Sequence, residues 1–276
     1  ASPLGWLNDG VLETRGNNVD AHLDRDNDDR PDLPRVQGTI TNGQRVFDFP
    51  IDFNQDPTNY ANAAVVQLFY WCNFMHDKLY ELGSTESTGN FQKDNFARGG
   101  LDNDAVSAEA QDGSGFNNAN YTPAPDGSPP KIQMYIFNGP TPGRDGDLDA
   151  EVICHEYTHG LSDRLIGGGV GIFQLQSFGM GEGWSDFFAE SLLSQFEDDP
   201  GANYPMGGYV TYQFSGLQQN YYYGIRRYPY TTNMNVDPLT FKDIDPTRAD
   251  PHTGVPRSPI IGSPAHEVHR QGEVWC

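Results

Sequence analysis

The run VICHEYTHGLSD at residues 152–163 places two histidines, His155 and His159, four positions apart with Glu156 between them. On an α-helix, residues i and i+4 differ by about 40° of rotation, so both imidazoles would project from one face, about one turn apart. Two imidazoles in this arrangement can bind one Zn²⁺, and Glu156 would lie on the adjacent flank, where it could act on a water. A bare pair of histidines on a helix is more often accidental, so this interpretation depends on a third ligand.

A catalytic zinc needs three protein ligands and one open position. One known arrangement adds a histidine six residues after the second, but that position is Leu165. Another adds a glutamate from the next helix, and Glu182 lies 23 residues after His159, where we expect the N-terminal end of that helix. Asp186, on the same face as Glu182, could accept a hydrogen bond from the outer nitrogen of a ligating histidine. Glu190 is the alternative ligand, and a charge favoured by the helix dipole is the alternative role of Glu182.

Apolar periodicity and glycine stops predict three helices in this chain. They cover residues 59–83, 149–169 and 179–200, and a strand is predicted at residues 131–137. The third helix carries a hydrophobic stripe that we predict to be core: Trp184, Phe187, Phe188, Leu192, Leu193 and Phe196.

The segments outside these helices are polar and rich in turns. An Asn42-Gly43 pair between alternating residues predicts a β-hairpin near the N-terminus. We therefore expect an α+β fold with a β-rich N-terminal lobe, a central helix pair and the start of a second lobe. The expected divisions are an N-terminal segment with an acidic loop, a catalytic core with the zinc-binding helices, and the start of the second lobe, at residues 1–58, 59–200 and 201–276.

The composition excludes several classes of partner. Asp and Glu outnumber Lys and Arg by 38 to 17, a net charge of −21, so nucleic acid and anionic membranes would be repelled. The three cysteines, Cys72, Cys154 and Cys276, are too few for a disulfide framework, and Cys154 is predicted to be a buried free thiol. No apolar run approaches the length of a membrane span, and the start at Ala1 is expected for a processed product or a fragment.

HEYTHGLSDRL followed by GMGEGWSDFFAE resembles the zinc site of the fungalysin family of secreted metalloendopeptidases, which shares its logic with thermolysin. Five longer segments are similar to fungalysin segments in the same order: FYWCNFMHDKLYELG, AEAQDGSGFNNANYTPAPDG, RDGDLDAEVICHEYTHG, GIRRYPYTTN and VHRQGEVW. The resemblance covers roughly residues 60–276 and implies a two-lobed thermolysin-like fold, Zn²⁺, protein or peptide substrates, secretion and an N-terminal propeptide before maturation. Fungalysin catalytic domains continue past the last of these segments, so the helical second lobe is expected to be truncated here. An inactive or incomplete paralogue that binds zinc or protein is the alternative.

The resemblance also assigns roles to single residues. The zinc ligands of the family carry over to His155, His159 and Glu182, its general base to Glu156, and the aspartate that orients a ligating histidine to Asp186. VHRQGEVW is similar to the family segment that presents a histidine to the oxyanion, which implies His269, with His266 as the nearby alternative.

Substrate contacts follow from the same resemblance. An Asn-Ala pair on an edge strand binds the substrate backbone in thermolysin-like enzymes, and NNANY is similar, which implies Asn118 and Ala119. An arginine that contacts the substrate carbonyl maps to Arg226, with Arg227 as the alternative. Asn120 begins a glycosylation sequon, and we expect it to be unoccupied because a glycan would obstruct this strand.

A second metal signal lies in LDRDNDDRPD near the N-terminus. The pattern D-x-D-N-D-x-x-P-D is similar to thrombospondin-type calcium loops, and carboxylates at alternate positions suit Ca²⁺. Asp29 stands where such loops usually have the glycine of a tight turn, so a solvated acidic loop is an equally good interpretation. The candidate calcium ligands are Asp24, Asp26, Asp28 and Asp32.

Overall fold

The structure is a computed structural model that describes residues 2–8, 10–168, 172–214, 220–244 and 271–276. Its main sheet has the strand order β1-β4-β6-β5. The strands are β1 (Val19–Leu23), β4 (Val106–Ala110), β6 (Lys131–Met134) and β5 (Ala119–Thr122). β1, β4 and β6 are parallel, whereas β5 pairs with β6 in the antiparallel direction. Because β5 is the last strand in this order, only one of its two edges is used in the sheet.

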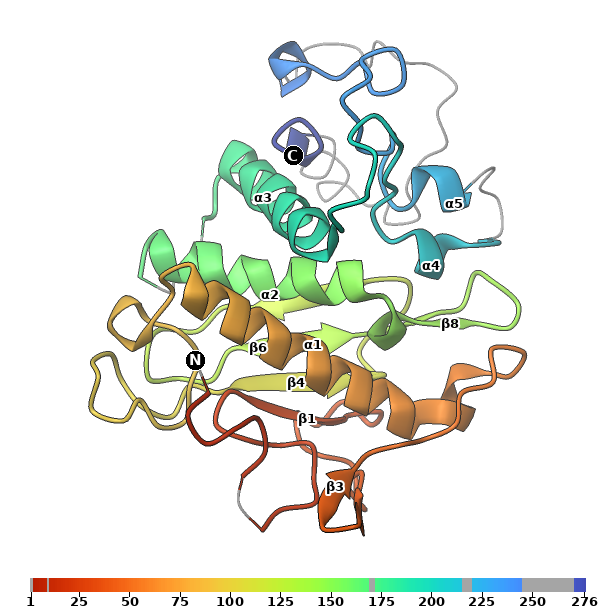
Figure 1. Cartoon of the computed structure of the whole chain (residues 1–276). Helices are drawn as coiled ribbons and strands as arrows, with labels where there is room; N and C mark the ends of the chain where they lie inside the picture. Colours follow the sequence, from red (N-terminus) through yellow and green to blue (C-terminus); the bar gives the residue numbers. More distant parts are fainter. Residues whose placement is uncertain (1, 9, 169–171, 215–219, 245–270) are drawn as a thin grey trace.

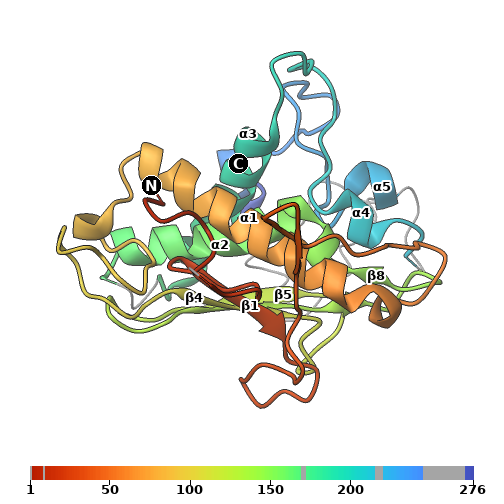
Figure 2. The ribbon, with the colours of Figure 1, turned by 60° about the horizontal axis from the view of Figure 1, so that its bottom comes forward.

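The two faces of the sheet differ in chemistry. One face is apolar and packs against helix α1 (Ala61–Glu81), and α2 (Ala150–Leu165) lies beside α1 on the same side (Figures 1 and 2). The other face is polar, with His22, Glu109, Gln133 and Asn120 opposite one another across the four strands. The core on the apolar face includes Val19, Ala21, Val106, Ala108, Ile132 and Met134 from the sheet and Leu68, Cys72, Met75 and Leu79 from α1.

Helix α3 (Leu175–Leu193) packs on α2 rather than on the sheet, so α2 is the layer between them (Figure 1). Two short helices follow, α4 (Gly208–Thr211) and α5 (Asn220–Tyr223). The remaining elements are the 3₁₀ helices η1 (Pro57–Tyr60), η2 (Glu86–Thr88), η3 (Gly146–Leu148) and η4 (Phe241–Ile244), and the strand pairs β2 (Thr39–Thr41) with β3 (Gln44–Val46) and β7 (Ile136–Phe137) with β8 (Arg144–Asp145). The mixture of helix and sheet confirms the expected α+β class.

Several local predictions are confirmed. β2 and β3 form the predicted hairpin, and Asn42 and Gly43 take φ values of 52° and 77°, as its tight turn requires. The first helix ends before Gly83, whose φ of 110° stops it. The predicted strand at residues 131–137 is interrupted at Tyr135, because β6 pairs within the main sheet while β7 pairs with β8.

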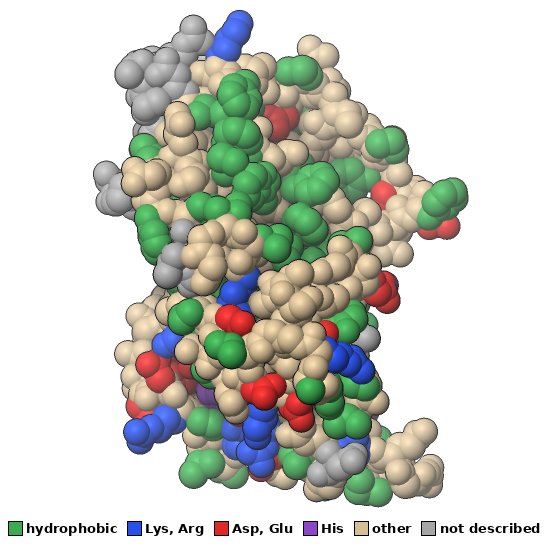
Figure 3. Space-filling view, turned by 90° about the vertical axis from the view of Figure 1, so that its left-hand side faces the viewer, with side chains coloured by type: hydrophobic (Ala, Val, Ile, Leu, Met, Phe, Trp, Pro, Cys, Tyr) green, Lys and Arg blue, Asp and Glu red, His purple; other side chains and the backbone are tan. Residues whose placement is uncertain are grey.

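The third helix differs from its prediction in two ways. It begins at Leu175, where Gln174 and Ser177 cap one another, so Glu182 lies in the middle of the helix and not at its N-terminal end. The predicted core stripe is wrong for Phe187, which is 49% exposed, and for Phe196, which lies beyond the helix and is fully exposed. The described residues leave both rings exposed to this extent. Hydrophobic side chains also gather on the upper part of the face drawn in Figure 3, the part of the molecule that contains α3.

The proposed division at residue 58 crosses the main sheet. β1, from the first 58 residues, is hydrogen bonded along its length to β4, from the segment after residue 58. The boundaries at residues 58 and 200 stay predictions. None of the helices in the described parts of the chain combines the length and apolarity needed to cross a membrane.

Arg164 anchors the C-terminal end of α2 to the loops beside it. Its side chain is 3% exposed and donates five hydrogen bonds, one of them to Asp104 Oδ2 at 2.9 Å. Removing one member of a buried ion pair leaves the other charge uncompensated, so Arg164→Met is expected to lower the free energy of unfolding by about 3–5 kcal/mol, measured by urea titration. Lys78→Met breaks an ion pair with Glu81 in which both side chains are exposed, 44% and 65%, and should cost less than about 1 kcal/mol. Equal losses in the two variants would contradict this prediction.

Candidate metal centre and active site

His155 and His159 on α2 meet Glu182 on α3 at the interface between the two helices. The Nε2 atoms of the two histidines are 3.0 Å apart. Glu182 Oε2 is 3.4 Å from His155 Nε2, and Glu182 Oε1 is 3.5 Å from His159 Nε2. The described residues thus bring two imidazole nitrogens and one carboxylate oxygen within 4.8 Å of one another.

Asp186 holds His155 in one orientation. Asp186 Oδ1 lies 2.6 Å from His155 Nδ1, one turn along α3 from Glu182. A proton on Nδ1 that is donated to this carboxylate leaves the lone pair of Nε2 directed at Glu182 and His159. Burial by itself would raise the pKa of Asp186, but Arg226 and His155 hold it well below its usual range, so Asp186 stays ionised.

Arg226 and Tyr230 support Asp186 from the opposite side. Arg226 Nε donates to Asp186 Oδ2 at 2.6 Å and Arg226 Nη2 donates to Oδ1 at 2.7 Å, while the Tyr230 hydroxyl donates to Oδ2. Arg226 Nη2 is also 3.5 Å from Glu182 Oε2. Both oxygens of the buried carboxylate are therefore fixed, and Arg226 connects it to the third member of the cluster.

The charges around His155 favour a cation at this place. Burial lowers the pKa of His155, but the Asp186 and Glu182 carboxylates outweigh it and raise the pKa to about 10. Two nitrogen donors, one carboxylate and a fixed imidazole tautomer are the donor set that zinc prefers. The residues present therefore fit a zinc ion.

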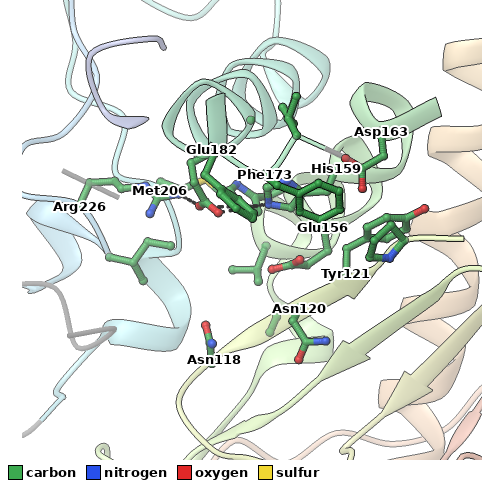
Figure 4. A pocket seen from close by; sticks show the side chains of 18 of the residues that line it. Asn118, Asn120, Tyr121, Glu156, His159, Asp163, Phe173, Glu182, Met206 and Arg226 are labelled. Atoms are coloured by element: carbon green, nitrogen blue, oxygen red, sulfur yellow. Dashed lines mark hydrogen bonds and ion pairs between the residues drawn. The ribbon is translucent and has the colours of Figure 1, made fainter. Parts of the chain in front are cut away.

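Glu156 follows His155 on α2 and lies inside the cavity next to the cluster (Figure 4). It is 6% exposed, and burial raises its pKa to about 7. Its carboxylate lies between the cluster and strand β5 (Figure 4). A carboxyl group with this pKa, beside an open site, can both take and return a proton near neutral pH.

The cavity has a volume of about 390 Å³ and reaches from α2 and α3 to β5, whose outer edge pairs with no other strand among the described residues. Asn118 and Ala119, at the start of β5, line it, and Arg226 lines it next to Glu182 (Figure 4). The Asn120 amide donates to Gln133 Oε1 at 3.0 Å and accepts from the Tyr135 hydroxyl. The cavity thus combines the metal-ligand cluster, Glu156 and a free strand edge.

The whole chain, residues 1–276, matches the model of the family described as fungalysin metallopeptidase (M36). This chain belongs to that family. It is 46% identical over 261 residues to an extracellular metalloproteinase of Pyrenophora tritici-repentis. This alignment covers 91% of the chain and 38% of that protein. It is also 39% identical to extracellular metalloproteinase 2 of Arthroderma otae and 40% identical to extracellular metalloproteinase 2 of Trichophyton rubrum, in both cases over all of the chain and 40% of the relative. The fungalysin chain therefore spans about two fifths of the length of these curated relatives.

Glu190, the alternative zinc ligand, and Arg227, the alternative substrate contact, both lie outside the cavity of this fungalysin chain. Glu190 lines a separate hollow together with Glu151 and Phe187, and it is not in the metal-ligand cluster. Arg227 instead pairs with Glu273, with Nε 2.6 Å from Oε2.

The close approach at Glu182 depends on glycine. A Cβ on Gly183 would lie 2.4 Å from the carbonyl oxygen of Gly272, so only glycine fits there. In turn, a Cβ on Gly272 would lie 2.7 Å from Glu182 Cβ. The segment at residues 271–276 is thereby packed on α3 beside the cluster.

Sequence reasoning missed part of the site. The hydrogen bond from Tyr230 to Asp186 could not be predicted from the sequence, because a single tyrosine in a tyrosine-rich segment is not distinctive. The apolar cavity walls lie in segments with weak periodicity and were not predicted; they include Ile172, Phe173, Phe178, Met206 and Ile225. His266 and His269, the two candidates for the oxyanion donor, lie outside the described residues.

The acidic loop also forms a cluster. Carboxylate oxygens of Asp24, Asp26 and Asp32 lie within 4.8 Å of one another, whereas the Asp28 carboxylate is not in this group. The Asp28 backbone instead donates to Asp24 Oδ1 at 3.0 Å. Asp29 takes the left-handed conformation, with φ of 60°, that a glycine usually occupies in such loops.

Cys154 and Cys72 are both buried free thiols, as predicted for Cys154. Burial raises the pKa of each thiol, so neither is poised as a thiolate nucleophile.

Proposed function

We propose that this chain carries the catalytic centre of a secreted zinc endopeptidase that hydrolyses peptide bonds in proteins. One observation carries the proposal: His155, His159 and Glu182 converge in a cavity that Glu156 and the free edge of β5 also line. The fold proposed with it is the two-lobed, thermolysin-like arrangement, with the sheet and α1 on one side of the cluster and α3 with the helices after it on the other.

His155, His159 and Glu182 would hold the zinc, and Asp186 would orient His155. When bound, zinc supplies a Lewis acid that acidifies water and polarises a carbonyl group. Glu182 is the proposed third ligand rather than Glu190, because its carboxylate oxygens lie 3.4 Å from His155 Nε2 and 3.5 Å from His159 Nε2, whereas Glu190 lies outside this cluster.

Glu156 moves the proton. As the water oxygen bonds to the carbonyl carbon, one water proton passes to a Glu156 carboxylate oxygen. The bond between carbon and nitrogen then breaks, and Glu156 returns this proton to the leaving amine. His269 is proposed as the hydrogen-bond donor to the oxyanion, on the resemblance to the family alone.

An extended substrate would pair with the free edge of β5 through its backbone. Strand addition supplies hydrogen bonds that do not depend on substrate side chains, which suits cleavage within many sequences. Asn118 and Ala119 lie at the start of β5, where this pairing would occur, and Arg226 also lines the cavity. Its guanidinium is engaged by Asp186 and Glu182, so we propose that it positions these carboxylates as well as facing substrate. A glycan on Asn120 is not expected, because its amide donates to Gln133.

Secretion and maturation are proposed for the longer protein. The similar proteins are named extracellular metalloproteinases, and this chain corresponds to about two fifths of their length. The relatives are longer than this chain, and a propeptide that covers the cavity before maturation would account for part of that difference in length. Calcium in the acidic loop is a further prediction. An inactive paralogue remains the second candidate function, and the Glu156 variant considered in the Discussion separates the two.

Metal analysis tests the ligand set. Purified protein is expected to carry one zinc in the cluster, and Glu182→Ala should lose most of it, because a three-ligand site becomes a two-ligand site. Zinc content after dialysis against zinc-free buffer is the measurement. Glu190→Ala is the matched control on the same helix and should keep the metal. Undiminished zinc in Glu182→Ala, or loss in Glu190→Ala, would transfer the ligand role to Glu190.

A further inference from the structure

A second cluster of carboxylates lies on the polar face of the sheet, away from the zinc site. Carboxylate oxygens of Asp24, Glu109 and Asp112 lie within 4.8 Å of one another. Their exposed fractions are 0%, 1% and 3%, so all three acids are buried. Two of them, Glu109 and Asp112, are far in sequence from the acidic loop and show no metal-binding pattern.

A glycine brings the two segments together. A Cβ on Gly113 would lie 2.2 Å from the carbonyl oxygen of Arg25, so the two backbones touch where only glycine fits. The Gly113 amide also donates to the carbonyl oxygen of Asp24 at 2.9 Å. Asp24 and Asp112, next to these contacts, therefore face one another at the end of β4.

The hydrogen bonds of the cluster leave one oxygen without a donor. Asp24 accepts from the backbone amides of Asp28 and Asp29, each at 3.0 Å. Asp112 accepts from the Ser114 amide at 2.7 Å and from the Gln133 side chain at 2.9 Å. Glu109 Oε2, in contrast, is buried and receives no hydrogen bond from the described residues.

Among the described residues, the cationic group that pairs with Glu109 is Lys131. Its Nζ is 3.8 Å from Glu109 Oε2, beyond hydrogen-bond distance, and it forms its shorter ion pair with Asp29. Burial, together with the charges of Asp112 and Asp24, raises the pKa of Glu109 to about 8 although Lys131 opposes this. One ammonium group is thus insufficient to neutralise three buried carboxylates.

We infer that Asp24, Glu109 and Asp112 form a buried binding site for a divalent cation, with Ca²⁺ as its ligand. Oxygen-only donors from several carboxylates suit a hard cation with a high coordination number. Asp26 and Asp32 lie within reach of Asp24 on the loop side and would complete the coordination. The site therefore joins the acidic loop to the sheet, whereas the sequence placed all its ligands within the loop.

The position of the site links it to the substrate-binding edge. Asp112 accepts a hydrogen bond from Gln133 Nε2, and Gln133 Oε1 accepts one from Asn120 on β5. Glu109, Gln133 and Asn120 are also neighbours in the strand register. A bound cation that fixes Glu109 and Asp112 would therefore stabilise β5 through the contacts of Gln133 with Asp112 and Asn120.

Calcium binding can be tested without any measurement of cleavage, so its failure would leave the proposed peptidase function untouched. We would use the zinc-loaded protein with Glu156→Gln, to avoid self-cleavage, and titrate it with Ca²⁺ in the presence of saturating zinc. Equilibrium dialysis should show one calcium per chain at this site. At 100 times the dissociation constant, the melting temperature should rise by about 5–10 °C.

Glu109→Gln is the variant and Glu81→Gln, whose side chain is 65% exposed, is the matched control. We expect Glu109→Gln to weaken calcium binding by about tenfold or more, while its melting temperature without calcium is no lower than that of the control, because a neutral amide of the same shape replaces a buried carboxyl group that is costly to ionise. Asp112→Asn should weaken binding in the same way and gives a second, independent variant. Unchanged calcium affinity in both variants, or no calcium binding by the parent protein, would overturn the inference.

Discussion

Glu156→Gln is expected to lower kcat/KM for a quenched casein or peptide substrate by about 10²- to 10⁴-fold while the protein keeps its zinc. Glutamine has nearly the same shape as glutamate but cannot take a proton from water. The residue is buried beside the cluster and is not one of the three groups within ligand distance, so the loss of its charge should leave the metal in place.

The measurement combines steady-state cleavage rates with zinc content for the same preparation. Glu151→Gln is the matched control, five positions earlier on the same helix. Burial raises the pKa of Glu151 to about 9, and its Oε2 accepts a hydrogen bond from the Gly207 amide, which a glutamine oxygen can also accept. This control should stay within a few-fold of the parent rate. Cleavage that persists in Glu156→Gln would reject the general-base role, and an inactive parent protein with bound zinc would favour the non-catalytic paralogue.

Asp186→Ala is expected to have the second large effect, on both zinc affinity and stability. It removes the hydrogen bond that holds His155 Nδ1 and the carboxylate that pairs twice with Arg226. Loss of a group that orients a metal ligand typically lowers metal affinity by about 10- to 100-fold. Loss of one partner of a buried ion pair typically costs about 3–5 kcal/mol, because the remaining charge is poorly solvated.

Two readouts separate these effects: zinc affinity from competition with a fluorescent chelator, and the free energy of unfolding from urea titration. Arg164→Met is a useful control because it also breaks a buried pair but lies at the end of α2, away from the cluster. It should reduce stability and leave zinc affinity unchanged. If Asp186→Ala lost stability but kept its zinc affinity, the proposed orientation of His155 by Asp186 would be wrong.

The success and the failure of the sequence-based predictions have different physical origins. The spacing of His155 and His159 is local, because helix geometry alone places residues i and i+4 on one face. The Asn42-Gly43 hairpin is local in the same sense, since its turn requires positive φ at both residues. The start of α3 was misplaced by four residues, because Gln174 and Ser177 cap the helix upstream of Gly179. Gly183 lies inside the helix and allows close packing against Gly272.

The fate of Phe187 and Phe196 shows another limit. Periodicity identifies which residues share a face, but it does not say whether anything covers that face. The described chain leaves both rings exposed, so a stripe that was assigned to the core lies partly on the surface.

The sequence by itself determined the chemistry of the zinc-site candidates, the helices that carry them and membership of the fungalysin family. The tertiary structure brings Glu182 to the two imidazoles, as the family resemblance implied. Only the tertiary structure decided the other meetings of distant groups: Arg226 and Tyr230 on Asp186, and Glu109 with Asp112 beside Asp24. The reason is that backbone geometry fixes distances over a few residues, whereas contacts between separate elements depend on how helices and strands pack. That packing depends on close backbone contacts such as those at Gly183 and Gly113. The spacing of residues along the sequence does not predict which segment each glycine contacts.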